Sequence, residues 1–245
     1  MTGRKNSSVI TKSRVAALKQ HLITWRLFWT DVLSPRNRIL FFLLSSFLLF
    51  SCSATPTPAT PQVVSVYSTS AAEPWLPPLY ECAGKSTVIS RVDDSSLADI
   101  VLRVGEPKIL TLSAYQIDSE DILIVTHRQS PMQNLTLEGA RALFAGQRDP
   151  SVQVWVYASE EDVQEVFDRI VMAGLSVTSA ARVALTPQQM SDTLVNESNA
   201  VGILPRHWKA GDDREVFAVA TVPVLALTNS EPQVVIKELI VCLQK

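Results

Sequence analysis

The segment "DILIVTHRQSPMQNLTLEGARALFAGQ", residues 121–147, joins a strand pattern to a helix pattern. The apolar, β-branched run from Ile122 to His127 predicts a strand. Thr136 predicts the start of a helix and Gly146 its end. The apolar face of this helix comprises Leu137, Ala140, Leu143 and Phe144. A strand followed by a helix is the repeating unit of α/β folds, so this segment favours that class.

The same alternation extends to both sides of this segment. Further strands are expected at 63–67, 87–92, 99–104, 110–117, 152–157, 200–205 and 217–227. Further helices are expected over 73–82, after Ser159, over 187–197 and over 231–243. Ser159 is the predicted N-cap of its helix, with Glu160, Glu161 and Asp162 in the first turn. The order of elements predicts an α/β body with a mostly parallel sheet.

A short apolar run near the N-terminus predicts export. It covers the 12 residues Ile39–Phe50, follows a basic segment, and is shorter than the roughly 20 residues that a spanning helix needs. Residues 1–51 are therefore interpreted as a signal peptide. The stretch Leu49-Phe50-Ser51-Cys52 resembles a bacterial lipobox, which implies that Cys52 carries lipid and becomes the mature N-terminus. An uncleaved signal anchor is the alternative, and a buried cytosolic helix would have no use for the basic flank.

Residues 52–62 are predicted to be a Pro/Thr linker, since alternating proline and threonine favour extended, solvated chain. Removal of the leader leaves 14 basic and 23 acidic residues, a net charge near −9. An acidic surface argues against nucleic acid as a partner and against adhesion to anionic lipid headgroups. The remaining 194 residues suit one domain or two small lobes.

The cysteines and histidines predict neither a metal site nor a cofactor. The sequence has no CxxC motif, and His21, His127 and His207 are scattered. Cys82 and Cys242 are an even pair that could form a disulfide in an oxidising compartment; the alternative is two unpaired, buried thiols. No GxSxG, HExxH or P-loop motif is present, so an enzyme is not predicted.

The order of segments resembles the phosphate-type solute-binding proteins of ABC importers. The most specific pieces are residues 135–146, which resemble the family's short helix ending in Phe-x-Gly, and "AVGILP" at 200–205. The resemblance implies a type II periplasmic-binding-protein fold with two lobes, each with a central mixed sheet flanked by helices. Lobe I would comprise 63–125 plus 206–245, and lobe II would comprise 126–205. The hinge would lie near Val125–His127 and Leu204–Arg206.

The resemblance also implies a function: a lipid-anchored, extracytoplasmic protein that binds a small solute, such as an oxyanion, and delivers it to an ABC permease. The candidate ligand-binding residues are Ser68, Thr69, Ser70, Arg103, Arg128 and Ser159. The alternatives are N-capping for the hydroxyl loop 68–70 and solvated surface charge for each arginine.

Two features of the candidate site depart from the family pattern. The aspartate that would accept a phosphate proton is absent beside Arg103, and the carboxylates of 160–162 would repel phosphate. The alternative function is therefore a sensory or interaction lipoprotein on the same scaffold, with a degenerate ligand site.

Overall fold

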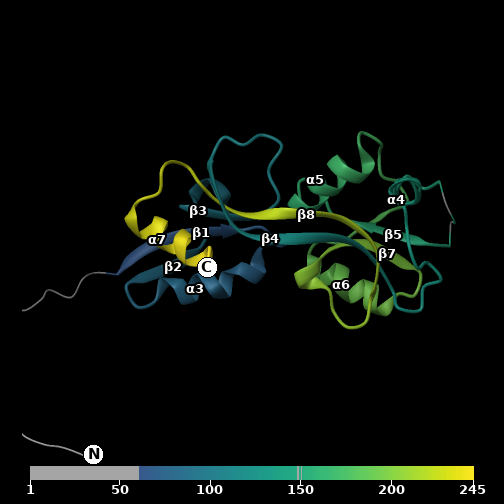
Figure 1. The fold of residues 1–245 in the computed structure, drawn as a ribbon, viewed down its shortest axis with the longest axis horizontal. Coiled ribbons are helices and arrows are strands. Elements are labelled where there is room, and N and C mark those ends of the chain that lie inside the picture. Colours follow the sequence, from purple (N-terminus) through teal and green to yellow (C-terminus); the bar gives the residue numbers. More distant parts are fainter. Residues whose placement is uncertain (1–60, 148, 150) are drawn as a thin grey trace, which may run out of the picture. The chain divides into compact units, whose positions relative to one another are not determined.

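The computed structural model describes residues 61–147, 149 and 151–245 (Figure 1). The predicted signal peptide, Cys52 and nearly all of the predicted linker lie outside the described residues. None of the helices in the described part is long and apolar enough to cross a membrane.

A single eight-stranded sheet runs through the described residues, with the strand order β2-β1-β3-β8-β4-β7-β5-β6. Its strands are β1 (Gln62–Ser68), β2 (Thr87–Arg91), β3 (Ile100–Val104), β4 (Ser113–Thr126), β5 (Gln153–Val156), β6 (Arg182–Val183), β7 (Ala200–Pro205) and β8 (Arg214–Thr228). β1 pairs in parallel with β2 and β3, and β5 pairs in parallel with β6 and β7. The pairs β3–β8, β8–β4 and β4–β7 are antiparallel. The sheet is therefore mixed, and the predicted parallel pairing is confined to its two ends.

The helices gather at the two ends of this sheet (Figure 1). η1 (Glu73–Trp75), α3 (Leu76–Ala83), η2 (Ser95–Leu97) and α7 (Val234–Leu243) accompany β1, β2 and β3. The other end carries α4 (Leu137–Phe144), α5 (Asp162–Phe167), its continuation η3 (Asp168–Met172) and α6 (Pro187–Asn196). A short turn, η4 (Arg206–Trp208), follows β7. The predicted α/β class is confirmed.

Strands β4 and β8 connect the two ends, where two separate sheets were expected. They pair over their whole length, from Ser113 opposite Thr228 to Thr126 opposite Arg214, with bulges along the way. The two strands expected at 110–117 and 122–127 are thus one strand. The polar run 118–121 between them is part of the continuous strand, because each of its acids has a partner. For example, Trp75 Nε1 donates to Asp118 at 3.0 Å. The division into lobes after residues 125 and 205 stays a prediction.

In the segment 121–147, helix α4 begins and ends where the sequence predicts. The Gly139 amide donates to Thr136 Oγ1 at 3.0 Å, which confirms the N-cap. After the helix, Gly146 has a φ of +76°, and a Cβ there would lie 2.7 Å from Thr178 Oγ1. Glycine is therefore required where the helix ends.

Two helix starts differ from expectation. Ser159 is not an N-cap: α5 begins three residues later, after Glu161. Neither η1 nor α3 has a side-chain cap, so the hydroxyl loop 68–70 does not cap the helix that follows it. Instead, η1 leads directly into α3, and Pro77 lies in the first turn of α3, where no intrahelical donor is needed.

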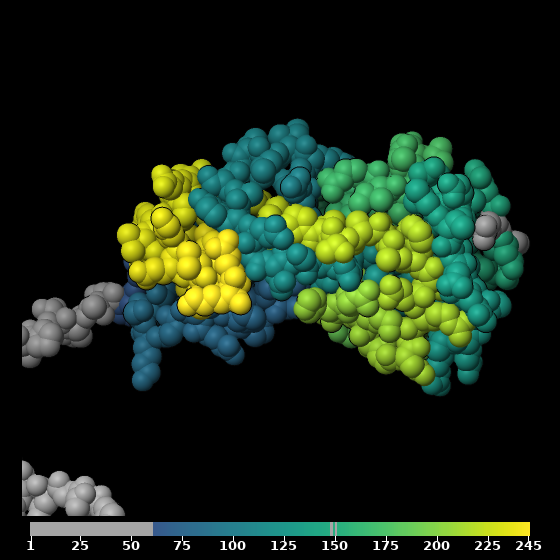
Figure 2. All heavy atoms as spheres, in the orientation of Figure 1, coloured from purple at the N-terminus to yellow at the C-terminus, as the bar shows by residue number. Residues whose placement is uncertain are grey.

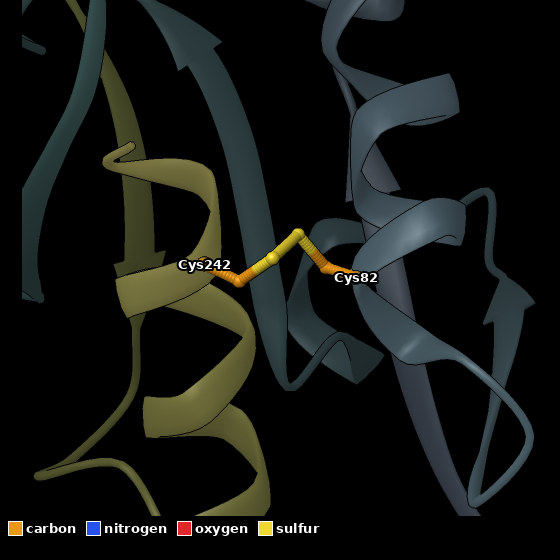
Figure 3. Close-up of a disulfide and its surroundings, with 2 residues drawn as sticks. All are labelled: Cys82 and Cys242. Atoms are coloured by element: carbon orange, nitrogen blue, oxygen red, sulfur yellow. A yellow bond between two sulfur atoms is a disulfide. The ribbon is translucent and has the colours of Figure 1, made fainter.

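A disulfide joins Cys82 of α3 to Cys242 of α7, with the two Cα atoms 5.9 Å apart (Figure 3). Of the two alternatives that the sequence left open, the structure has the disulfide. The bond links helices 160 residues apart in sequence. It therefore fixes the C-terminal helix against the first segment of the fold.

Candidate functional site

The hydroxyl loop 68–70 lies beside the end of β3. β1 and β3 are parallel, with Ser68 opposite Leu102, so both strands end at the same edge. The Thr69 amide donates to the Leu102 carbonyl at 3.0 Å, which fixes the loop against β3. This pairing brings two sequence-predicted groups together: the hydroxyls of the loop and Arg103, the residue after Leu102.

The start of α5 meets this edge through a buried carboxylate. Thr69 Oγ1 donates to Asp162 Oδ2 at 2.6 Å, and the Val104 amide donates to the same oxygen at 2.8 Å. The Val163 amide donates to Asp162 Oδ1 at 2.8 Å. Asp162 is only 2% exposed. Its carboxylate therefore ties together the loop after β1, the end of β3 and the start of α5.

Two further carboxylates of the same segment pair with Ser70 and Arg103. Ser70 Oγ donates to Glu161 Oε2 at 3.1 Å. Arg103 pairs with Glu165, Nη2 to Oε2 at 2.9 Å, and both side chains are largely buried. In Figure 2, the green residues of α5 and η3 adjoin the teal segment that follows β3. The segments expected to face each other across a ligand are thus in direct contact.

Gly105 shows how closely the two segments approach. It follows Val104 with a φ of +75°, and a Cβ at this position would lie 2.7 Å from Val166 Cγ2 of α5. A larger residue would push the segments apart or strain the backbone.

The electrostatics of this contact are acidic. Burial raises the pKa of Asp162, although the hydrogen bonds from Thr69 and Val104 oppose that shift. Burial is also the main cause of the raised pKa of Glu161, and Asp162 adds to the shift. The pKa of Tyr157 is raised by burial and by both carboxylates, and its hydroxyl is buried without a partner. A further anion brought to this position would meet repulsion from two neighbouring acids.

Three predicted site residues make other contacts. Ser68 Oγ donates to the Thr69 carbonyl at 3.0 Å. Arg128 forms an exposed ion pair with Asp212, 2.9 Å from Nη1 to Oδ2, which agrees with the surface-charge interpretation. Ser159 is exposed, and its hydroxyl donates to Glu160 at 3.1 Å. The contact therefore unites Thr69, Ser70 and Arg103, and neither Arg128 nor Ser159 takes part in its hydrogen bonds.

A second polar pair, which sequence reasoning missed, lies where β4 meets η4. Glu120 is 1% exposed, and its Oε2 is 2.6 Å from His207 Nδ1. The His207 ring packs against Trp75, with the ring centroids 4.7 Å apart. Burial raises the pKa of Glu120. The sequence offered little signal, because Glu120 lies within the polar run 118–121, and its need for a partner arises only from its burial.

Sequence reasoning anticipated acidic repulsion at 160–162 but missed the role of Asp162. Only Asp162 of the three is buried, and its partner Thr69 lies 93 residues away in sequence. Within residues 61–147, 149 and 151–245, no group of three or more His, Cys, Asp or Glu side chains is placed to hold a metal ion.

Comparisons with known proteins identify the fold. No family model matches the sequence, and no curated protein matches it. A putative phosphate ABC transporter substrate-binding protein with bound phosphate from Clostridium perfringens is 16% identical, with a TM-score of 0.65. That match covers 74% of this chain and 92% of the other. An ABC-type phosphate transport receptor from Vibrio cholerae is also 16% identical, with a TM-score of 0.58, covering 74% and 93%.

A regulatory protein also resembles this chain. The reduced regulatory domain of OxyR2 from Vibrio vulnificus is 10% identical, with a TM-score of 0.57, covering 78% of this chain and 99% of that domain. The chain therefore has the fold of type II periplasmic-binding proteins. At these identities the likeness concerns the fold, which serves both transport proteins and a regulatory domain.

Proposed function

We propose that the protein is an extracytoplasmic binding protein, anchored through lipid on Cys52, that presents a small solute to an ABC permease. The proposed solute site is the contact between the hydroxyl loop 68–70, the end of β3 and the start of α5. One observation carries the assignment: Thr69 donates to Asp162 at 2.6 Å, joining the two segments that the family resemblance places around a ligand. A binding role fits better than catalysis, since the sequence has no recognisable nucleophile or metal motif.

The proposed solute is neutral or cationic, and inorganic phosphate is disfavoured. Glu161 and Asp162 both accept hydrogen bonds at the site, so a solute that donates hydrogen bonds could replace Ser70 and Thr69 as their partner. An oxyanion offers only acceptors and negative charge, which these carboxylates repel.

A solute screen tests this function. The mature protein is heated with inorganic phosphate or sulfate, with neutral sugars, and with polyamines or basic amino acids, and each hit is titrated by calorimetry. We expect no stabilisation by phosphate and stabilisation by a neutral or cationic compound, because a ligand that binds only the folded state raises its stability. Phosphate binding in the micromolar range would contradict the proposed solute class.

The anchor has a separate test. Cys52→Ala should move the protein from the membrane fraction to the soluble extracytoplasmic fraction, because the acylated thiol would be absent. Ser53→Ala is the matched control, since it changes the neighbouring residue but leaves the Cys52 thiol. An unchanged membrane fraction for Cys52→Ala would contradict lipid attachment there.

A sensory or interaction protein is the second candidate. The observation that favours it is the buried Asp162 carboxylate, whose oxygens already satisfy the donors around them. This candidate predicts that no solute class stabilises the protein in the screen. It also predicts that a partner protein, rather than a small molecule, changes its thermal stability.

A further inference from the structure

The Asp162 carboxylate is held as a bound anion would be held. Three donors converge on its two oxygens: the Thr69 hydroxyl, the Val104 amide and the Val163 amide, at 2.6 to 2.8 Å. Hydrogen bonds to an ionised oxygen are stronger than neutral ones. The carboxylate therefore satisfies the amides of two buried residues and the hydroxyl of the partly buried Thr69.

Helix capping accounts for only one of the three bonds. The N-cap of α5 is Glu161, which makes no side-chain cap bond, and Asp162 is the first residue of the helix, where it accepts from the Val163 amide. The Thr69 and Val104 donors come from 93 and 58 residues away in sequence. Asp162 thus links distant segments, whereas a cap serves only its own helix.

The charges around Asp162 favour one negative charge at this position and oppose a second. Arg103 lies close enough for its charge to favour the ionised carboxylate, and it is itself paired with Glu165 at 2.9 Å. Glu161 is a second acid close enough for its pKa to be raised by the Asp162 charge. With the Asp162 side chain in place, the donors are occupied and the neighbouring acids oppose further negative charge.

We propose that Asp162 is a built-in anion that sets the specificity of this site: its carboxylate occupies the donors that would bind a free carboxylate or oxyanion, and so excludes such ligands. The side chain joins the loop after β1 to α5 without a ligand. Removal of the carboxylate should leave a site of matching chemistry for a small free anion. The inference rests on the proposed function for the location of the site.

Chemical rescue of Asp162→Ala by formate tests the proposal. The substitution keeps Cβ and removes the carboxylate group. Formate is a free carboxylate of the same size, so it can take the place of the missing group. We expect Asp162→Ala to melt below the wild type, and formate to raise its melting temperature by several degrees towards the wild-type value. Wild type should not respond to formate, and chloride at equal ionic strength should not rescue the variant.

Two variants separate specific rescue from a general salt effect. Asp162→Asn fills the same space without charge, so formate should not raise its melting temperature. Glu160→Ala removes an exposed carboxylate two residues away, and formate should not affect it either. Equal responses of Asp162→Ala and Asp162→Asn, or no response of Asp162→Ala, would overturn the proposal.

If Asp162→Ala does not fold unaided, its recovery on dilution from urea with and without formate gives the same answer. Formate-dependent recovery supports the built-in anion, and equal recovery in chloride overturns it. The outcome is independent of the solute screen, which uses the wild type. A wild type that binds no solute, together with a rescued Asp162→Ala, would refute the proposed function and leave this inference standing.

Discussion

Thr69→Val tests the bond that joins the hydroxyl loop 68–70 to α5. Valine keeps the branched shape of threonine and replaces its hydroxyl with a methyl group. The lost bond is 2.6 Å long and ends on a carboxylate that is 2% exposed. Hydrogen bonds to charged groups contribute about 1.5–3 kcal/mol to stability. Asp162 retains two backbone donors, so we expect a loss within that range.

The assay is equilibrium unfolding in urea, supported by thermal melting. In a domain of this size, each kcal/mol shifts the melting temperature by about 2–4 °C, so a drop of roughly 3–12 °C is expected. Thr221→Val is the matched control, because Thr221 Oγ1 donates to Asp121 Oδ1 over the same 2.6 Å at an exposed site. Thr221→Val should lower the free energy of unfolding by less than about 1 kcal/mol, since water can replace a hydrogen bond at an exposed site.

Two results would refute this reasoning. If Thr69→Val and Thr221→Val lose the same stability, burial of Asp162 does not strengthen its bond to Thr69. If Thr69→Val loses less than about 0.5 kcal/mol, which is the usual scatter of surface substitutions, the contact does not hold the segments together.

Three further perturbations address other parts of the fold. Replacing Cys82 and Cys242 with alanine removes a cross-link over 160 residues and should lower the free energy of unfolding in urea by up to about 5 kcal/mol. A thiol assay that detects free Cys82 or Cys242 in the unreduced wild type would show that the disulfide is absent. The pKa of the Asp162 carboxyl is raised in the folded state, so the folded protein binds a proton at this carboxyl more tightly than the unfolded chain does. Stability should therefore rise in wild type relative to Asp162→Asn as the pH falls from 7 to about 4, and a pH-independent difference would contradict the shift. His207→Phe keeps an aromatic ring but leaves buried Glu120 without its 2.6 Å partner. We expect the free energy of unfolding to fall by about 1–3 kcal/mol, and the added substitution Glu120→Gln to restore most of it. Unchanged stability of His207→Phe would refute the pairing.

Local signals in the sequence predicted the elements that depend on local interactions. The N-cap at Thr136 and the end of α4 at Gly146 involve neighbours within a few residues, and both are confirmed. The α/β class also followed from the order of strands and helices. The Cys82–Cys242 pairing was one of two open alternatives, and only the three-dimensional arrangement of α3 and α7 decides it.

The features that the sequence did not predict depend on distant partners. β4 was expected as two strands because the polar run 118–121 interrupts its apolar pattern. Trp75 and His207 supply the missing partners from elsewhere in the chain. The acidic character of residues 160–162 could be read from the sequence alone. The inward position of Asp162 could not, because only the pairing of β1 with β3 places the Thr69 hydroxyl beside it.

A crystal structure of Asp162→Ala grown in formate tests the central claim most directly. We predict formate between the Thr69 hydroxyl and the Val104 amide, with the loop 68–70 and α5 placed as in the wild type. An empty position, or a loop that has moved to satisfy its donors elsewhere, would contradict the claim that Asp162 stands in for a bound anion.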